Sequence, residues 1–245
     1  MDKRSIIDLS IVLPTYKEKE NLLVFIPQIE EGFQGTDFEI IIVDDNSKDG
    51  TRELVENLNR QYENIRLIER AGLLGIGSAL REGYDRALGT FILSSDADLS
   101  FTVSDMRSLN KKIREGYDIV LGYKVEYRPN GQEVKRQKSF SVAVKNHLSE
   151  MGNWMVRFMS GMGKIRNFNT NFRIIRRSTW QAVHTNEDRN FFLFETIIKA
   201  QKAGAKITEI PVTFYNRKFG QSKLNFFKEA PKYFWKLILY TFFPK

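Results

Sequence analysis

The sequence predicts an α/β fold in which a mostly parallel sheet is covered by helices. Two observations predict it. Short apolar runs of strand length alternate with segments of helical spacing through the first half, and polar loops follow several of these runs. With 42% apolar residues, the 245-residue chain can bury a sizeable core, and it contains no repeats or low-complexity linker.

The expected elements follow in order along the chain. Strands are predicted at Leu9–Leu13, Phe38–Val43, Ile65–Ile68, Phe91–Ser94, Asp118–Leu121, Phe172–Ile175 and Ile207–Phe214. Helices are predicted at Glu20–Glu31, Thr51–Tyr62, Ser78–Leu88, residues 102–114 and Asn190–Ala203, with a further helical pattern within Gln132–Gly163. Asp49 or Thr51 is a suitable N-cap for the second helix, and Thr102 with Asp105 forms a capping-box pattern before the fourth.

Charge is distributed unevenly along the chain. Residues 1–123 contain 15 basic and 22 acidic side chains, whereas residues 124–245 contain 23 basic and 8 acidic side chains. This asymmetry predicts an anionic partner for the second half. Nucleic acid, an anionic membrane and a phosphorylated substrate all satisfy it.

Composition excludes several classes of site. The absence of cysteine excludes disulfides, thiolate metal sites and cysteine nucleophiles. His147 and His184 are far apart in sequence, so they favour surface or capping roles over a zinc site. No uncharged apolar stretch approaches the ~20 residues needed to cross a bilayer, and the first residues do not form a signal peptide.

Carboxylates follow two of the predicted strands. Asp96 and Asp98 come after Phe91–Ser94, and alternate residues of an extended segment can turn two carboxylates toward one ligand. Oxygen ligands suit Mg²⁺ or Mn²⁺, which keep positions open for phosphate oxygens. We expect these loop carboxylates to be exposed. Asp-x-Asp alone is a weak motif, and its position at a strand end favours function over a solvated turn.

Two further loops carry candidate ligand contacts. Asp44 and Asp45 follow Phe38–Val43; they can accept from a nucleotide base and ribose, or form a turn that caps the next helix. Gly72, Gly75 and Gly77 precede the Ser78–Leu88 helix, where glycines permit close backbone approach to an anion. Their spacing matches no phosphate-binding fingerprint, and a flexible loop is the alternative.

Four ordered motifs together resemble glycosyltransferase family 2, which has the GT-A fold. They are Ile11-Val-Leu-Pro-Thr-Tyr-Lys-Glu, Ile42-Val-Asp-Asp-Asn-Ser-Lys-Asp-Gly-Thr, Ser95-Asp-Ala-Asp-Leu-Ser, and Glu209-Ile-Pro-Val-Thr-Phe with Arg217-Lys-Phe-Gly-Gln-Ser-Lys-Leu. The last motif, with Asn171-Phe-Arg-Ile-Ile-Arg-Arg, is similar to dolichol-phosphate mannose synthases and related polyprenyl-phosphate sugar synthases. The resemblance covers about residues 6–225 and implies a catalytic domain over residues 1–225.

The resemblance also implies roles for individual residues. Pro14, Tyr16, Glu18 and Asp45 would hold the base and ribose of a nucleotide-sugar, and Asp96, Ala97 and Asp98 its diphosphate. A Mg²⁺ or Mn²⁺ ion would be held by Asp96 and Asp98, and by Ser100, which stands where mannose synthases often have glutamine. Arg217 and Lys223 would contact the phosphates of donor and acceptor, with Lys135, Arg136, Lys164 and Arg166 as weaker candidates. Lys124 replaces an arginine common in the family, so both GDP-mannose and UDP-glucose remain open as donors.

The implied reaction is inverting transfer of a hexose to polyprenyl or dolichyl phosphate. Such a phosphate is already ionised near neutral pH, so the enzyme must position two substrates and screen their charges but needs no strong base. The alternative within the family is a saccharide hydroxyl acceptor in cell-surface polysaccharide synthesis, which requires a carboxylate base. Glu195 occupies the approximate place of that base, or it supports the Asn190–Ala203 helix.

The last twenty residues, 226–245, predict a tail that associates with membranes. Lys228, Lys232 and Lys236 recur every four residues and would line one helical face beside aromatic residues. We therefore expect a peripheral protein on the cytoplasmic face of a membrane; a terminal helix packed on the domain is the alternative. A nucleic-acid-binding protein would leave the carboxylate motifs without a role, and a catalytically inactive nucleotide-sugar sensor would not need them intact.

Overall fold

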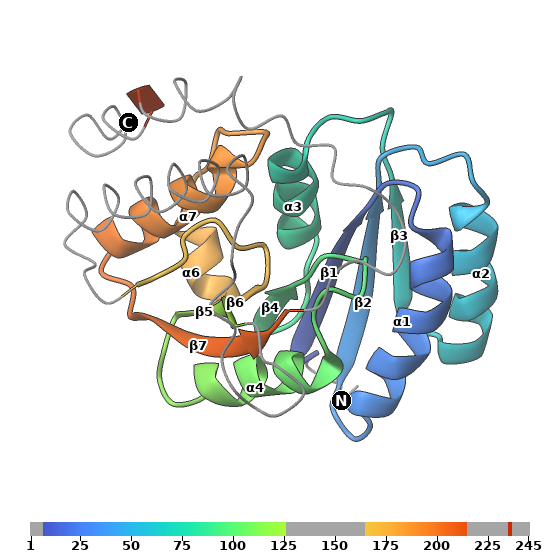
Figure 1. The fold of residues 1–245 in the computed structure, drawn as a ribbon, viewed down its shortest axis with the longest axis horizontal. Coiled ribbons are helices and arrows are strands. Elements are labelled where there is room, and N and C mark those ends of the chain that lie inside the picture. The colour runs from blue at the N-terminus through green and yellow to red at the C-terminus, as the bar shows by residue number, and fades with distance from the viewer. Residues whose placement is uncertain (1–6, 126–164, 215–234, 237–245) are drawn as a thin grey trace, which may run out of the picture.

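The computed structural model describes residues 7–125, 165–214 and 235–236 (Figure 1). Its strands are β1 (Leu9–Thr15), β2 (Phe38–Asp44), β3 (Ile65–Glu69), β4 (Phe91–Ser94), β5 (Ile119–Val125), β6 (Arg173–Arg176) and β7 (Ile207–Thr213). Its helices are α1 (Lys19–Gly32), α2 (Thr51–Tyr62), α3 (Ile76–Asp85), α4 (Val103–Ile113), α6 (Arg177–Gln181) and α7 (Phe191–Lys202). Every predicted strand and helix within the described residues is present, whereas α6 was not predicted.

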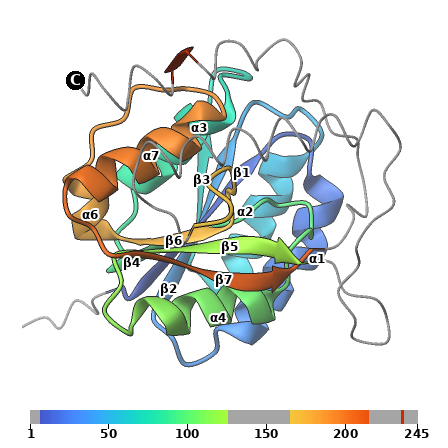
Figure 2. The ribbon, with the colours of Figure 1, turned by 60° about the vertical axis from the view of Figure 1, so that its left-hand side comes forward.

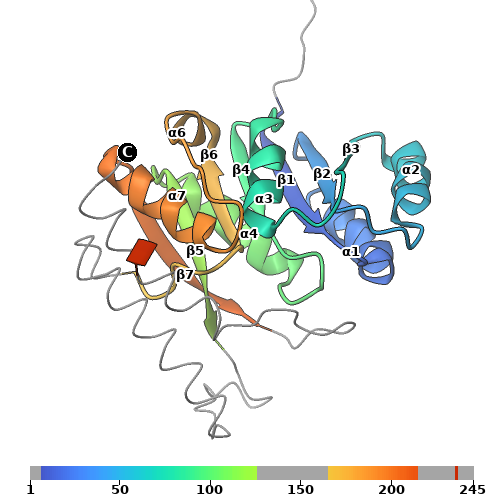
Figure 3. The same cartoon turned by 90° about the horizontal axis from the view of Figure 1, so that it is seen from above.

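The seven strands form one sheet in the order β3-β2-β1-β4-β6-β5-β7 (Figure 3). All pairs are parallel except those of β6, which runs antiparallel to both β4 and β5. The predicted mostly parallel sheet is therefore confirmed. After β3 the chain returns across β1 to begin β4, so the direction of strand addition reverses between β1 and β4. Ligands bind beyond the carboxyl ends of strands at such a reversal.

Helices cover both faces of the sheet, as Figure 2 shows with α3 and α7 on one side and α4 on the other. The central strands are apolar on both faces because each face meets helices, which explains their continuous apolar runs. Val12, Ile41 and Val43 pack toward α3, α6 and α7, while Ile11, Ile40 and Ile42 pack toward α1, α2 and α4. Two cores thus fix the strands that support the loops at the carboxyl edge.

Local signals set several element boundaries. The predicted capping box is confirmed, because Thr102 Oγ1 accepts from the Asp105 backbone N–H at 3.0 Å and contacts the Asp105 carboxylate at 2.7 Å. At α2 the N-cap position is Gly50, with φ of 89°, and Asp49 instead accepts from the Thr51 N–H at 3.1 Å. Among the described residues no helix is long and apolar enough to span a bilayer.

Candidate functional site

The loops that follow β1, β2 and β4 are joined to one another at the carboxyl edge of the sheet. The Asp45 N–H donates to the Thr15 carbonyl at 2.9 Å, and the Lys17 N–H donates to Ser47 Oγ at 2.8 Å. Ser95 N–H donates to the Val12 carbonyl at 3.3 Å. The carboxyl ends of β1, β2 and β4 therefore lie together at this edge.

Left-handed backbone is concentrated in these same loops. Five non-glycine residues have positive φ among those described, and four of them lie here: Lys17 (59°), Asn46 (61°), Lys48 (52°) and Leu99 (61°). Such conformations are costly for residues with a Cβ atom and persist only where the surroundings impose them. The hydrogen bonds that join the loops after β1 and β2 restrain Lys17 and the two residues that flank Ser47.

The adjacent carboxylates Asp44 and Asp45 have different roles. Asp44 accepts from the Ser47 backbone N–H at 2.8 Å and from the Ser47 hydroxyl, so it builds the turn. Asp45 instead forms an ion pair with Arg70, and both side chains are at least 93% buried. Burial raises the pKa of the Asp45 carboxyl, and the Arg70 guanidinium opposes that rise.

Arg70 connects Asp45 to helix α3. Its guanidinium donates to the Ser78 hydroxyl and lies 3.2 Å from the Glu82 carboxylate. Its own backbone N–H donates to the Asp44 carbonyl at 2.9 Å. Sequence analysis missed Arg70. The available signal was an arginine at the end of a predicted strand, in the same kind of position as the two aspartate motifs.

Asp96 and Asp98 lie at the end of β4, as predicted, but only Asp96 is partly exposed. Asp98 is 3% exposed, which overturns the expectation of an exposed loop carboxylate. The Ser100 backbone N–H donates to Asp98 at 3.1 Å. Asp96 accepts from the Asn171 side-chain amide at 3.1 Å. Ala97 between them is buried in the core.

Asn171 and Arg173 were not predicted as functional, and Asn171 contacts Asp96 directly. Asn171 precedes β6, its backbone carbonyl accepts from Ser94 Oγ at 2.6 Å, and its side-chain oxygen is buried without a hydrogen-bond partner. Arg173 is fully buried and donates to the carbonyls of Thr170 at 2.9 Å and Leu193 at 3.1 Å. Burial lowers the pKa of Arg173 to about 10, so it stays charged at neutral pH.

The donor set around Asp96 and Asp98 fits a hard divalent cation. Two carboxylates, one partly exposed, offer oxygen ligands and leave coordination positions for phosphate oxygens and water. In the described part of the chain, no cluster of three or more acidic or histidine side chains could hold a metal ion alone. A cation bound by these two carboxylates would therefore complete its coordination with phosphate oxygens and water. Ser100 is buried beside Asp98.

The residues expected to hold the base lie on the same edge. Pro14 is the penultimate residue of β1 and pairs with Val43 of β2. Tyr16 and Glu18 are partly exposed in the loop that follows, and the Glu18 carboxylate accepts from the Asn21 side-chain amide. The structure thus places these residues on the same edge as Asp45.

Comparison with known proteins identifies the family. A family model described as glycosyl transferase family 2 matches residues 10–196. The chain belongs to glycosyl transferase family 2. Every motif loop described above except the β7 end lies within the matched residues.

Three curated relatives of this family 2 chain have related names. The dolichol-phosphate mannosyltransferase of Pyrococcus furiosus is 31% identical over 219 residues, covering 88% of this chain and 59% of that protein. A dolichyl-phosphate beta-glucosyltransferase of Trichomonas vaginalis is 28% identical, covering 83% and 64%. The polyprenol monophosphomannose synthase of Mycolicibacterium smegmatis is 27% identical, covering 88% and 80%. The chain thus spans less than two thirds of the first two relatives.

Solved structures support the fold expected of family 2. Glucosyl-3-phosphoglycerate synthase from Mycobacterium tuberculosis, crystallised with Mn²⁺, UDP and glucosyl-3-phosphoglycerate, aligns with a TM-score of 0.71 at 15% identity, covering 97% of this chain and 80% of that one. A second crystal of that protein, with Mn²⁺, UDP and phosphoglyceric acid, aligns with a TM-score of 0.70 at 15% identity, covering 97% and 78%. At this identity the likeness shows the fold alone.

The glycines at the start of α3, Gly75 and Gly77, have a packing role in this family 2 domain. A Cβ atom on Gly75 would lie 2.5 Å from the Asp188 carbonyl, and one on Gly77 would lie 2.6 Å from the Arg189 carbonyl. Both glycines therefore admit another stretch of protein backbone at close range. A Cβ atom on Gly72, by contrast, would meet nothing within 4 Å. Packing against this backbone is enough to explain glycine at positions 75 and 77, without a bound ligand or a flexible loop.

Glu195 is fully buried and its carboxylate is occupied. It accepts from the backbone N–H groups of Asn186 at 2.9 Å and Glu187 at 2.9 Å, and it lies 3.0 Å from Lys199 Nζ. Of the two interpretations of Glu195, this geometry favours support of the segment before α7. A general base needs a lone pair directed at a substrate proton.

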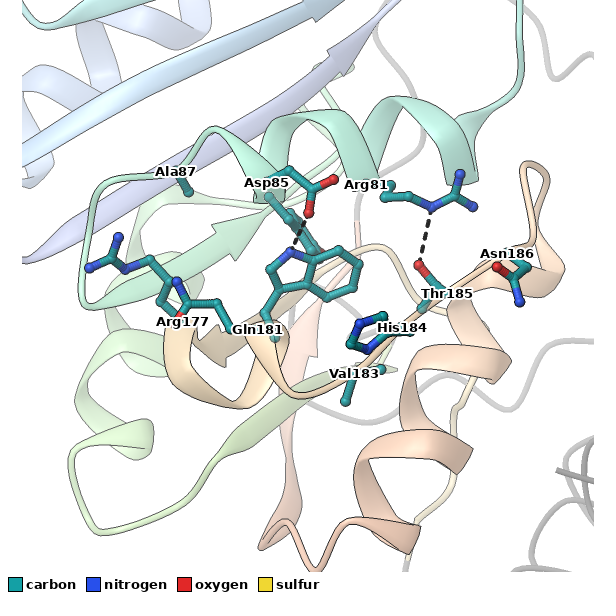
Figure 4. A pocket seen from close by; sticks show the side chains of 11 residues that line it. Arg81, Asp85, Ala87, Arg177, Gln181, Val183, His184, Thr185 and Asn186 are labelled. Carbon is teal, nitrogen blue, oxygen red and sulfur yellow. Dashed lines mark hydrogen bonds between the residues drawn. The ribbon is translucent and has the colours of Figure 1, made fainter. Parts of the chain in front are cut away.

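A cleft in the described part of the chain lies away from the carboxylate loops. It has a volume of about 420 Å³, between α3, α6 and the chain that follows α6. Figure 4 shows Asp85 beside the cleft bonded to the Trp180 indole, with Arg177 and Gln181 at one end and Arg81 and Thr185 at the other.

Several expected site residues lie outside the described residues. These are Arg217, Lys223, Lys135, Arg136, Lys164, Lys228 and Lys232. Arg166 is described, and its guanidinium lies 4.7 Å from the Tyr123 ring and 3.6 Å from Glu209. Lys124 lies 3.8 Å above the Phe214 ring.

The buried Asp45–Arg70 pair predicts a pH-dependent stability defect in Arg70→Met. Without the guanidinium, the pKa of Asp45, already raised by burial, rises further. A carboxyl whose folded pKa exceeds its unfolded pKa stabilises the fold at low pH, and this contribution is lost as pH rises through the folded pKa. The variant should therefore lose about 3–5 kcal/mol of unfolding free energy at neutral pH, and the deficit should narrow on acidification.

Urea unfolding at a series of pH values measures this deficit. In an Asp45→Asn background, Arg70→Met should give a deficit that varies less with pH, because only the partly exposed Glu82 carboxylate then loses its contact with the guanidinium. If the loss of unfolding free energy in Arg70→Met did not vary with pH, the Arg70 guanidinium would have no effect on the pKa of Asp45.

Proposed function

We propose that this chain transfers a hexose, with inversion, from a nucleotide-sugar to polyprenyl or dolichyl phosphate at a membrane surface. The observation that carries the proposal is that three relatives with 27–31% identity are all named for polyprenol or dolichol phosphate chemistry. The relatives are named for both mannosyl and glucosyl transfer, which supports mannose or glucose as the sugar, and the proposed donor is GDP-mannose or UDP-glucose. No nucleic acid takes part.

The donor would lie on the edge made by the three loops. Asp45 would accept from the base or ribose with Pro14, Tyr16 and Glu18 around it. Asp96 and Asp98, with Ala97 between them, would face the diphosphate. The strained loops and their mutual hydrogen bonds hold these groups in place before substrate binds, which reduces reorganisation during reaction.

Asp96 and Asp98, with Ser100, would hold Mg²⁺ or Mn²⁺. When bound, such a cation would neutralise negative charge developing on the diphosphate leaving group. Asn171 fixes the orientation of Asp96, and the Ser100 N–H fixes that of Asp98, so both carboxylates are pre-oriented by this chain.

We expect turnover to require a divalent cation and Asp98. Because Asp98 is buried, alanine would also remove its contact with the Ser100 N–H, so Asp98→Asn is the sharper variant. It should abolish turnover while thermal unfolding stays close to that of the parent. Asp85→Asn, which keeps an acceptor for the Trp180 indole, is the matched control and should remain active. Full activity in excess EDTA would show that turnover does not require a divalent cation.

An ionised phosphate acceptor explains why Glu195 can be fully engaged inside the protein. The attacking oxygen carries no proton to remove, so the chain must position and screen charge, with Arg217 and Lys223 as the expected phosphate contacts and Lys135 and Arg136 as weaker ones. The saccharide-hydroxyl alternative would need Glu195 to release its two backbone partners and Lys199.

A transfer assay tests the identity of the acceptor. The protein is incubated with polyprenyl phosphate and labelled UDP-glucose or GDP-mannose, and the label in the extracted lipid is measured. We expect label in the lipid phase, a loss within about tenfold for Glu195→Gln, and a larger loss for Arg217→Ala. Since glutamine also weakens the hold on Asn186 and Glu187, rates are compared below the unfolding temperature. Any fall in turnover rate at acid pH should be the same in Glu195→Gln as in the parent, because Glu195 would not be the group whose protonation causes it. A folded but inactive Glu195→Gln beside a nearly active Arg217→Ala would indicate a sugar hydroxyl acceptor.

The tail is proposed to bind anionic membranes from the cytoplasmic side as a peripheral element. Of its three spaced lysines, only Lys236 is described, and it forms an ion pair with Glu187 rather than facing away from the domain. Trp235 beside it is 64% exposed. Lys228 and Lys232 therefore remain the candidates for lipid contact.

Vesicle sedimentation tests the tail. Binding to anionic vesicles should weaken with salt, and Lys228→Glu with Lys232→Glu should release the protein. Lys111→Glu on α4 serves as a control for a surface charge change. Equal binding to neutral and anionic vesicles would support a packed terminal helix.

A further inference from the structure

Residues 185–189, between α6 and α7, contact α3 through a dense set of hydrogen bonds; we call them the 185–189 segment. Arg81 of α3 donates to Thr185 Oγ1 at 3.1 Å, to the Glu187 carbonyl at 2.6 Å and to the Asp188 carboxylate at 2.9 Å. The Ser78 N–H, near the start of α3, donates to the Asp188 carbonyl at 3.0 Å. The segment therefore holds α3 at its N-terminal end and along its side.

The glycines at the start of α3 make this contact possible. Cβ atoms on Gly75 and Gly77 would meet the backbone of the 185–189 segment at 2.5–2.7 Å, closer than side chains tolerate. Backbone-to-backbone contact leaves little freedom for α3 to shift relative to the segment.

The segment is itself fixed from two other directions. The buried Glu195 carboxylate of α7 accepts from the N–H groups of Asn186 and Glu187. From the tail, Lys236 pairs with the Glu187 carboxylate and lies 5.7 Å from the Phe191 ring. One short segment thus connects α3, α7 and the tail.

The other side of α3 carries the support of Asp45. Ser78 accepts from the Arg70 guanidinium, Glu82 lies 3.2 Å from it, and Arg70 pairs with Asp45. Since Ser78 and Glu82 both belong to the ten-residue α3, a shift of α3 would move two partners of the Arg70 guanidinium.

We propose that the 185–189 segment positions the donor site, with Arg81 as the positioning residue and Lys236 joining the tail to the same support. This rests on the proposed function, because it takes Asp45 to contact the nucleotide. The segment acts through α3 and Arg70 and touches no reacting atom. Loosening it should therefore weaken nucleotide binding while leaving the chemical step intact.

Calorimetric titration of the full chain with UDP and with GDP, in Mn²⁺ and without acceptor, tests the proposal. Arg81→Met should raise the dissociation constant of the preferred nucleotide about tenfold, and Lys236→Met should raise it less. The donor KM should rise in parallel, with kcat at saturating donor and the lipid KM unchanged. Arg114→Met, which removes an ion pair with Asp8 at the end of α4, is the matched control and should leave nucleotide affinity unchanged.

A second measurement separates positioning from general loss of stability. Hydrogen exchange at the Ser78 amide, whose acceptor is the Asp188 carbonyl, should accelerate in Arg81→Met but not in Arg114→Met. If Arg81→Met lowers the melting temperature while the nucleotide dissociation constant and Ser78 exchange stay at parental values, the proposal is overturned and the proposed function stands. A parental protein that binds neither nucleotide would overturn the donor site, and with it both proposals.

Discussion

The parallel pairing of β1 with both β2 and β4 is the constraint on which the candidate site depends. It brings the ends of three strands, and the loops that follow them, to one edge of the sheet. Hydrogen bonds between the loops after β1 and β2 then restrain three left-handed residues, Lys17, Asn46 and Lys48. Asp45 and Asp96, 51 positions apart in the sequence, are thereby brought to one edge of the same sheet.

Buried charge is handled in three ways around this edge. Asp45 and Arg70 neutralise each other, Arg173 is satisfied by carbonyl groups, and Glu195 is satisfied by N–H groups and Lys199. Each arrangement offsets the cost of removing an ion from water. Several of the partners come from other elements of the fold, so the buried charges also fix the relative positions of α3, β6 and α7.

Periodicity and strand-end carboxylates were enough to predict most of the fold and the three motif loops. Most strand limits differed by a few residues, because a ladder ends where its partner ends and not where apolar character ends. Arg70 and Asn171 were missed because each supports a carboxylate that is distant in the sequence. Arg70 contacts Asp45, 25 positions away, and Asn171 contacts Asp96, 75 positions away. Gly75 and Gly77 were noticed, but the backbone that approaches them comes from residues 187–189, more than a hundred positions later.

Some of the basic residues of the second half, residues 124–245, are buried or paired with groups of the domain itself. Among the described residues, Arg173 is buried, Arg176 pairs with Asp118, and Lys199 contacts Glu195. These cations stabilise the domain and are not offered to a ligand. Residues 126–164 and 215–245 hold many of the remaining basic side chains, including Arg217 and Lys223. A charge count alone therefore overstates the field that the described domain presents. The two residues for which the family resemblance implies phosphate contacts, Arg217 and Lys223, both lie in the second of those stretches.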